Sequence, residues 1–177
     1  MSDVDFESLI TSIPDYPEQG VIFKDITTLL KDPEGFKAAI DEIVEQFKDA
    51  GATKVVGAEA RGFIVGAPVA YALGAGFVPA RKPGKLPREA YSEDYELEYG
   101  TATLEIHTDA LSADDRVLIV DDLAATGGTV AAQVKLVQKF GAQVVGMGFL
   151  MQLDFLNPEK KISEVTDAPM FSVVHVG

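Results

Sequence analysis

Two adjacent aspartates, Asp121 and Asp122, end an apolar run and are followed, after Leu123 and Ala124, by the sequence ATGGT at residues 125–129. A carboxylate pair repels anions and accepts hydrogen bonds from a diol, or holds Mg²⁺ through water. The glycines instead allow a tight turn whose N–H groups converge on an anion, helped by the positive end of a following helix. Together the two features predict a ligand with hydroxyls at one end and a phosphate at the other, as in a sugar phosphate.

Other interpretations of this stretch explain it less well. An acid pair that only caps a helix would not need two glycines and two threonines beside it. A phospho-accepting receiver domain also places acids at a strand end, but it would need most of its fold after the acids, where only residues 123–177 remain. The turn also lacks the lysine of a P-loop and the G-x-G-x-x-G spacing of a dinucleotide-binding loop.

Strands and helices alternate along the chain, which predicts how the acids are positioned. The patterns indicate helices at residues 36–51, 62–74 and 127–141, and strands at residues 53–60, 76–82, 97–111, 116–122, 143–153 and 170–177. The run at residues 116–122 is typical of a central parallel strand covered on both faces. The alternation predicts a doubly wound α/β fold, a mainly parallel central sheet flanked by helices. Ligands of such sheets bind beyond the carboxyl ends of the strands, where the aspartates lie.

Residues 81–100 do not fit this alternation. The segment is polar, carries Pro83, Gly84 and Pro87, and lies between two predicted strands, so we expect a long mobile loop. Loops of this length inside compact domains are usually functional. Arg81, Lys82 and Lys85 at its start form a local basic patch that favours anion binding.

Composition excludes several classes of function. The 177 residues predict a single domain, and 15 basic against 28 acidic residues give a net charge of −13, which argues against nucleic-acid or membrane binding. The chain has no cysteine and therefore no disulfide, thiolate metal site or cysteine nucleophile. The first twenty residues lack the basic and apolar regions of a signal peptide, so we expect a cytoplasmic protein. His107 and His175 are isolated, and we expect structural roles for them.

The apolar strand, the two acids and ATGGT together resemble the 5-phosphoribosyl 1-pyrophosphate (PRPP) signature of the type I phosphoribosyltransferases. Four further stretches, YPEQGVIFKDITTLL, GAEARGF, RKPGKLP and YELEYG, extend the resemblance over residues 13–176, and the last two are similar to the adenine-specific enzymes of that family. The resemblance implies purine salvage, in which adenine and PRPP give AMP and pyrophosphate, with Mg²⁺, in a homodimer. It also implies one phosphoribosyltransferase domain over residues 1–177, with a base-pocket segment at about 13–30 and a mobile catalytic loop at about 81–100.

The same resemblance implies a role for each part of the site. Asp121 and Asp122 would lie under the ribose hydroxyls, and Glu98 and Tyr99 would close over ribose and base. The ribose 5-phosphate would bind Ala125, Thr126, Gly127, Gly128 and Thr129. Pyrophosphate would contact Glu59, Ala60, Arg61, Gly62, Arg81, Lys82 and Lys85, partly across the dimer interface. No direct protein ligand of Mg²⁺ is expected, because the ion would bind through PRPP. Its contact with the protein would be a water bridge to Asp121 or Asp122.

For the base, the resemblance implies an acceptor at the Ile22 carbonyl, stacking on Phe23, Leu153 on the opposite face, and Arg61 nearby. An acceptor against the amino group selects adenine over 6-oxopurines. Consistent with this, GFLMQLDF at residues 148–155 has no lysine, whereas 6-oxopurine relatives place one there.

Two residues depart from the family pattern: Gln152 replaces a common glutamate and Lys24 a common arginine. Either departure could change the details of the base site or the contacts of the dimer. The alternative functions are a phosphoribosyltransferase for xanthine or for hypoxanthine and guanine, and a ligand-binding regulator on the same fold. The regulator is disfavoured, because the acidic chain has no room for a DNA-binding segment.

Overall fold

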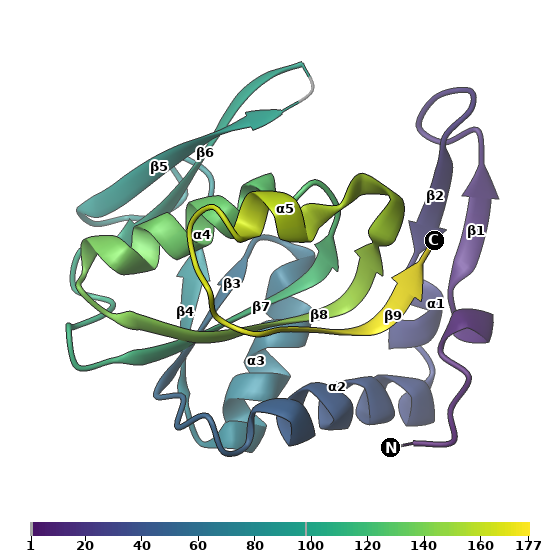
Figure 1. Ribbon diagram of the computed structural model, residues 1–177, viewed down its shortest axis with the longest axis horizontal. Helices are drawn as coiled ribbons and strands as arrows, with labels where there is room; N and C mark the ends of the chain where they lie inside the picture. The colour runs from purple at the N-terminus through teal and green to yellow at the C-terminus, as the bar shows by residue number, and fades with distance from the viewer. Residues whose placement is uncertain (1, 98) are drawn as a thin grey trace. The chain divides into compact units, whose positions relative to one another are not determined.

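The computed structural model describes residues 2–97 and 99–177, and the chain forms two compact units, residues 1–42 and 43–177. The larger unit holds a five-stranded sheet (Figure 1). Its strands, in spatial order, are β4 (Gly76–Ala80), β3 (Lys54–Ala58), β7 (Arg116–Ala124), β8 (Gln143–Leu153) and β9 (Met170–Val176). All four pairings are parallel, so the predicted α/β fold with a central parallel sheet is confirmed.

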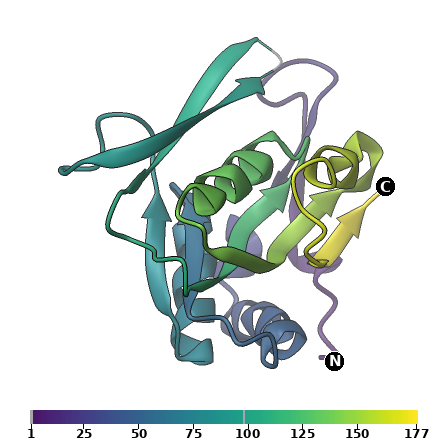
Figure 2. The ribbon, with the colours of Figure 1, turned by 60° about the vertical axis from the view of Figure 1, so that its left-hand side comes forward.

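Helices cover both faces of the sheet. Helix α3 (Arg61–Leu73) packs on β3 and β7, while α4 (Gly128–Lys139) lies on the opposite face over β7 and β8 (Figures 1 and 2). Residues 117–120 of β7 are fully buried between them, which confirms the predicted central strand. Helix α3 ends, as its sequence predicts, at Gly74, whose φ of 69° is readily adopted by glycine.

Glycines in β8 allow a helix to approach the sheet closely. The end of α2 (Pro33–Phe47) lies over this strand. A Cβ on Gly146 would lie 2.4 Å from Cε1 of Phe47, and one on Gly148 would lie 2.9 Å from Cγ2 of Ile43. The absence of side chains at these positions therefore sets the distance between helix and strand.

The predicted loop at residues 81–100 is irregular only in its first half. From residue 90 the chain forms β5 (Ala90–Leu97), which pairs antiparallel with β6 (Gly100–His107), so the expectation of a loop at residues 90–97 is wrong. The reason is tertiary: α4 packs against β5 and covers one face of a strand that is polar in isolation. The alternation expected along β6 is confirmed, with Leu104 and Ile106 buried. Mobility of the segment remains a prediction.

Several short elements are not evident from periodicity. The smaller unit contains the 3₁₀ turn η1 (Glu7–Leu9), an antiparallel pair of β1 (Thr11–Pro14) and β2 (Ile22–Asp25), α1 (Thr27–Leu30) and the first part of α2. The larger unit adds η2 (Asp154–Leu156) and α5 (Pro158–Ile162). Such elements are too short for a hydrophobic period to be detected. Among the described residues no helix combines the length and the apolar character needed to cross a membrane.

Substituting Gly146 with alanine tests the close approach of α2. We expect the free energy of unfolding to fall by about 1–3 kcal/mol, the usual effect of overpacking, because the new methyl group overlaps the Phe47 ring. Urea denaturation measures this change. The double variant Phe47→Leu with Gly146→Ala should lose less stability than the sum of the two single variants, and simple additivity would contradict the proposed overlap.

Candidate active site

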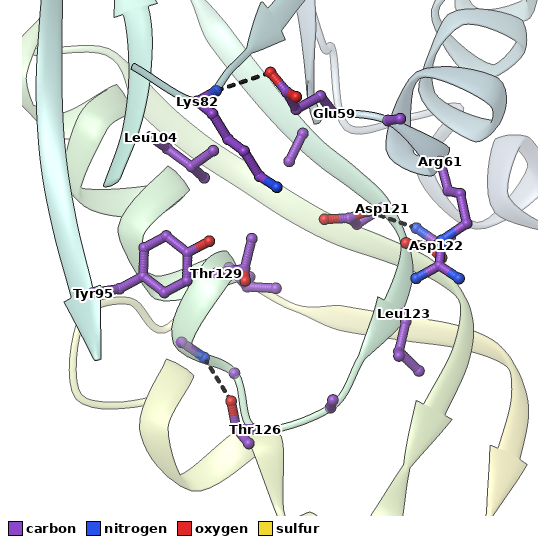
Figure 3. A pocket seen from close by; sticks show the side chains of 16 residues that line it. Glu59, Arg61, Lys82, Tyr95, Leu104, Asp121, Asp122, Leu123, Thr126 and Thr129 are labelled. Atoms are coloured by element: carbon purple, nitrogen blue, oxygen red, sulfur yellow. Dashed lines mark hydrogen bonds and ion pairs between the residues drawn. The ribbon is translucent and has the colours of Figure 1, made fainter. Parts of the chain in front are cut away.

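A cavity of about 300 Å³ lies beyond the carboxyl ends of β3 and β7 (Figure 3). Most of the predicted site residues line it: Glu59, Ala60, Arg61, Lys82, Asp121, Asp122 and residues 125–129. These residues come from the end of β7 and from the segments that follow β3, β4 and β7, three neighbouring strands of the sheet. The fold thus brings the predicted acids, the glycine turn and part of the basic patch around one space.

The two acids lie side by side at the end of β7. Asp121 is 6% exposed and Asp122 is 7% exposed. Arg61 forms an ion pair with Asp122, with 2.9 Å between Nε and Oδ2. The main-chain N–H of Asp122 donates to Oδ1 of Asp121 at 2.8 Å, and Nε2 of Gln133 donates to Oδ2 at 3.4 Å. Burial, and then the negative charge of Asp122, raises the pKa of Asp121 well above its usual value.

Glycine at position 62 permits the first turn of α3 to reach these acids. A Cβ on Gly62 would lie only 2.7 Å from Oδ1 of Asp121. Gly62 is buried and does not itself line the cavity. Its contribution is the close packing that lets the neighbouring Arg61 meet Asp122.

The ATGGT segment forms the tight turn that its glycines predict. Gly127 is the N-cap of α4 with a φ of 88°, and the N–H of Gly128 points toward Oγ1 of Thr126 at 3.4 Å. A Cβ on Gly127 would lie 2.7 Å from the carbonyl oxygen of Pro158, so the turn rests directly on α5. The turn and the positive end of a twelve-residue helix together offer an anion site.

Glu59 organises the basic side of the cavity. Its Oε1 accepts hydrogen bonds from the main-chain N–H of Lys82 at 2.9 Å and from Nε of Arg81 at 3.1 Å. The bond from Lys82 and, to a smaller extent, the one from Arg81 lower the pKa of Glu59. The Lys82 side chain extends into the cavity (Figure 3). The carboxylate of Glu59 therefore holds the segments after β3 and β4 together and leaves a cation facing the ligand space.

Some predicted site residues lie outside this cavity. Arg81 faces Glu59 and lies over the Phe63 ring at 5.9 Å, while Lys85 and Tyr99 are exposed. Glu98 lies outside the described residues.

The residues expected to bind the base belong to different units of the chain. In the smaller unit Ile22 is exposed on β2, and Phe23 packs edge-on against Tyr16 with 5.2 Å between ring centroids. Leu153 ends β8 in the larger unit and is half-buried. The assignment of these three residues to the base stays a prediction.

The structure adds residues to the site that the sequence interpretation missed. Tyr95, Leu104 and Leu123 also line the cavity, together with Ala58 and Val130. The signal for Tyr95 is its four-residue spacing from Tyr91, which places both side chains on one face of β5. This spacing becomes informative only once the strand is recognised. Gln133 is fully buried behind Asp121, and its Oε1 has no partner among the described residues.

Both departures from the family pattern have local partners. Gln152 is buried, with Nε2 donating to Glu159 at 2.9 Å and Oε1 accepting from Ser172 at 3.0 Å. Lys24 donates to Oγ of Ser12 at 2.7 Å. His107 and His175 do not line the cavity, and Nδ1 of His175 lies 2.9 Å from Asp154.

Comparisons with known proteins give one consistent result. The model of the phosphoribosyl transferase domain family matches residues 25–171. An adenine phosphoribosyltransferase of Desulfitobacterium hafniense is 57% identical over 162 residues, covering 92% of this chain and 94% of that protein. A solved adenine phosphoribosyltransferase of Thermoanaerobacter pseudethanolicus has a TM-score of 0.92 at 46% identity, covering 97% and 98% of the chains. The Giardia lamblia enzyme, solved with 9-deazaadenine, has a TM-score of 0.93 at 37% identity, covering 100% and 99%.

The raised pKa of Asp121 predicts a pH-dependent gain in stability for Asp121→Asn. Above the unfolded pKa, near 3.8, wild-type Asp121 disfavours the folded state because folding hinders its ionisation, and this loss grows as the pH rises toward the folded pKa. The variant should therefore melt at a higher temperature than wild type at about pH 8 and at the same temperature at about pH 3. Differential scanning calorimetry measures both. The exposed Asp114→Asn is the control, and an equal pH dependence in the two variants would contradict the assignment.

Proposed function

Because the chain belongs to the phosphoribosyltransferase family and is an adenine phosphoribosyltransferase of purine salvage, we propose how its residues share that reaction. The observation that carries the proposal is the cavity itself, which joins a carboxylate pair, an anion-binding turn and a lysine in one space. PRPP has a diol, a 5-phosphate and a pyrophosphate, and each of these groups has a matching partner there.

The acids and the turn hold the sugar. In the proposal, the main chain of residues 125–129 binds the 5-phosphate, and Asp121 and Asp122 accept hydrogen bonds from the ribose hydroxyls. The bond from C1 to the pyrophosphate oxygen breaks ahead of adenine attack, leaving positive charge on the ribose. Two carboxylates below the ring favour that charge, so catalysis comes from positioning and electrostatics.

The basic side of the cavity receives the leaving group. The segment of residues 59–62 and the side chains of Arg61 and Lys82 offset the charge of the departing pyrophosphate. Glu59 acts by holding Arg81 and Lys82 in place, which is supported by its hydrogen bonds to both. Lys85 is assigned to pyrophosphate by resemblance, and reaching the ligand requires the segment that carries it to move.

Mg²⁺ fits this arrangement as an ion carried by the substrate. Among the described residues no cluster of three or more acidic, histidine or cysteine side chains could hold a metal ion, and Asp122 is paired with Arg61. As the resemblance implies, the ion would bind through PRPP, with a water bridge to Asp121 or Asp122. When bound, Mg²⁺ supplies positive charge that neutralises pyrophosphate oxygens.

The base and the covering segment complete the proposal. By resemblance, Ile22, Phe23, Leu153 and Arg61 are each assigned to adenine. Glu98 and Tyr99 would close over the ribose and base, exclude water and orient the base or accept its proton.

A homodimer in the cytoplasm is the assembly that we infer. Large apolar side chains exposed on the chain, among them Tyr71 and Ile64 on α3, are available to such an interface.

The function is tested by pyrophosphate release with PRPP and Mg²⁺. We expect turnover with adenine and a kcat/KM at least about 10³-fold lower with hypoxanthine, guanine or xanthine, because an acceptor placed against the amino group leaves a 6-oxo group unpaired. Competing the four bases for labelled PRPP gives the ratio directly. Comparable turnover with a 6-oxopurine would exclude the assigned acceptor.

The assigned role of Glu98 predicts a defect in the chemical step. Glu98→Gln should lower the single-turnover rate roughly a hundredfold, since a positioned acid–base group contributes on that scale. The exposed Glu96→Gln, two residues earlier on β5, is the matched control and should react at the wild-type rate. A wild-type rate in Glu98→Gln would remove Glu98 from the mechanism.

A further inference from the structure

Tyr95 brings a phenol from the hairpin to the cavity. Successive side chains of a strand point to opposite faces, so Tyr91, Glu93 and Tyr95 of β5 share one face. Tyr91 packs edge-on against Phe140, with 5.1 Å between ring centroids. Glu93 forms an ion pair with Lys139, with 3.1 Å between Oε2 and Nζ. These contacts fix this face of β5 against α4 and direct Tyr95 toward the beginning of that helix.

The ring of Tyr95 lies against the phosphate turn. It is half-buried and packs on the hydrophobic core of the larger unit. Its Cδ2 would lie 3.6 Å from a Cβ placed on Gly128, and the carbonyl oxygen of Glu96 would lie 3.5 Å from the same point. The packing of the ring therefore positions the side chain without help from its hydroxyl.

The hydroxyl of Tyr95 has no protein partner within residues 2–97 and 99–177. Tyr95 lines the cavity, and its oxygen points into it (Figure 3). A donor held by a rigid ring beside an anion-binding turn has the chemistry of a phosphate ligand, because hydrogen bonds to charged oxygens are the strong ones.

We propose that the Tyr95 hydroxyl donates a hydrogen bond to the 5-phosphate of the sugar held by residues 125–129. The inference rests on the proposed function, which assigns that phosphate to the turn. The pyrophosphate is the less suitable acceptor, since its assigned partners Arg61 and Lys82 follow β3 and β4, whereas the Tyr95 ring lies next to the turn, with Cδ2 at 3.6 Å from the position of a Cβ on Gly128. When the turn at residues 125–129 holds a phosphate, this hydrogen bond connects the hairpin of β5 and β6 to the ligand.

Tyr95→Phe tests the proposal, since it removes one oxygen and keeps the ring. By isothermal titration calorimetry we expect the Kd of ribose 5-phosphate to rise roughly tenfold to a hundredfold, the effect of losing one hydrogen bond to a charged group. The Kd of inorganic pyrophosphate with Mg²⁺ should stay at the wild-type value. The KM for PRPP should rise more than kcat falls, and the urea midpoint should not change.

Tyr91→Phe is the matched control, because Tyr91 lies on the same face of the same strand but outside the cavity. It should bind both ligands as wild type does. Wild-type affinity for ribose 5-phosphate in Tyr95→Phe, or a loss confined to pyrophosphate, would overturn the assignment. Assays of the wild-type protein test the proposed function separately. If the wild-type protein released no pyrophosphate from PRPP and adenine and bound no ribose 5-phosphate, both the proposed function and this inference would be refuted.

Discussion

Two neighbouring carboxylates at the end of one buried strand are the constraint on which the site depends. Like charges in a poorly solvated place oppose folding unless other groups compensate them. Here compensation comes from both faces of the sheet, with Arg61 on α3 beside Asp122 and Gln133 on α4 beside Asp121. The position of each helix is therefore linked to the same pair of acids, and Gly62 is needed because the first turn of α3 comes so close to them.

The second constraint is the short distance along the chain between these acids and the phosphate turn. Only Leu123 and Ala124 separate Asp122 from the turn, so the chain must pass quickly from a negative to a positive environment. Gly127 makes this possible through its positive φ and its contact with the main chain at Pro158. A short helix far along the sequence thus supports the turn, and its contribution to the site is mechanical.

The central sheet and the chemistry at the end of β7 were predictable because the signals are local. An apolar run identifies a buried strand, and paired glycines before a helical pattern identify the turn. The hairpin was not predictable in the same way. The face of β5 that carries Tyr91 and Glu93 is stabilised by Phe140 and Lys139 of α4, which are distant in sequence, so residues 90–97 alone show only polarity. Tyr95 was missed for the same reason, and so was Gln133, whose side chain is indistinguishable in sequence from a solvated helix position.

The hydrogen bonds of Glu59 have an energetic consequence for ligand capture. By accepting from the main chain of Lys82 and from Arg81, this carboxylate ties together the segments that follow two neighbouring strands. The conformational entropy of bringing these segments together is thus lost during folding, before any anion arrives. Arg81 and Lys82 are therefore already in position when pyrophosphate arrives. More of the interaction energy of the pyrophosphate then remains available as binding affinity.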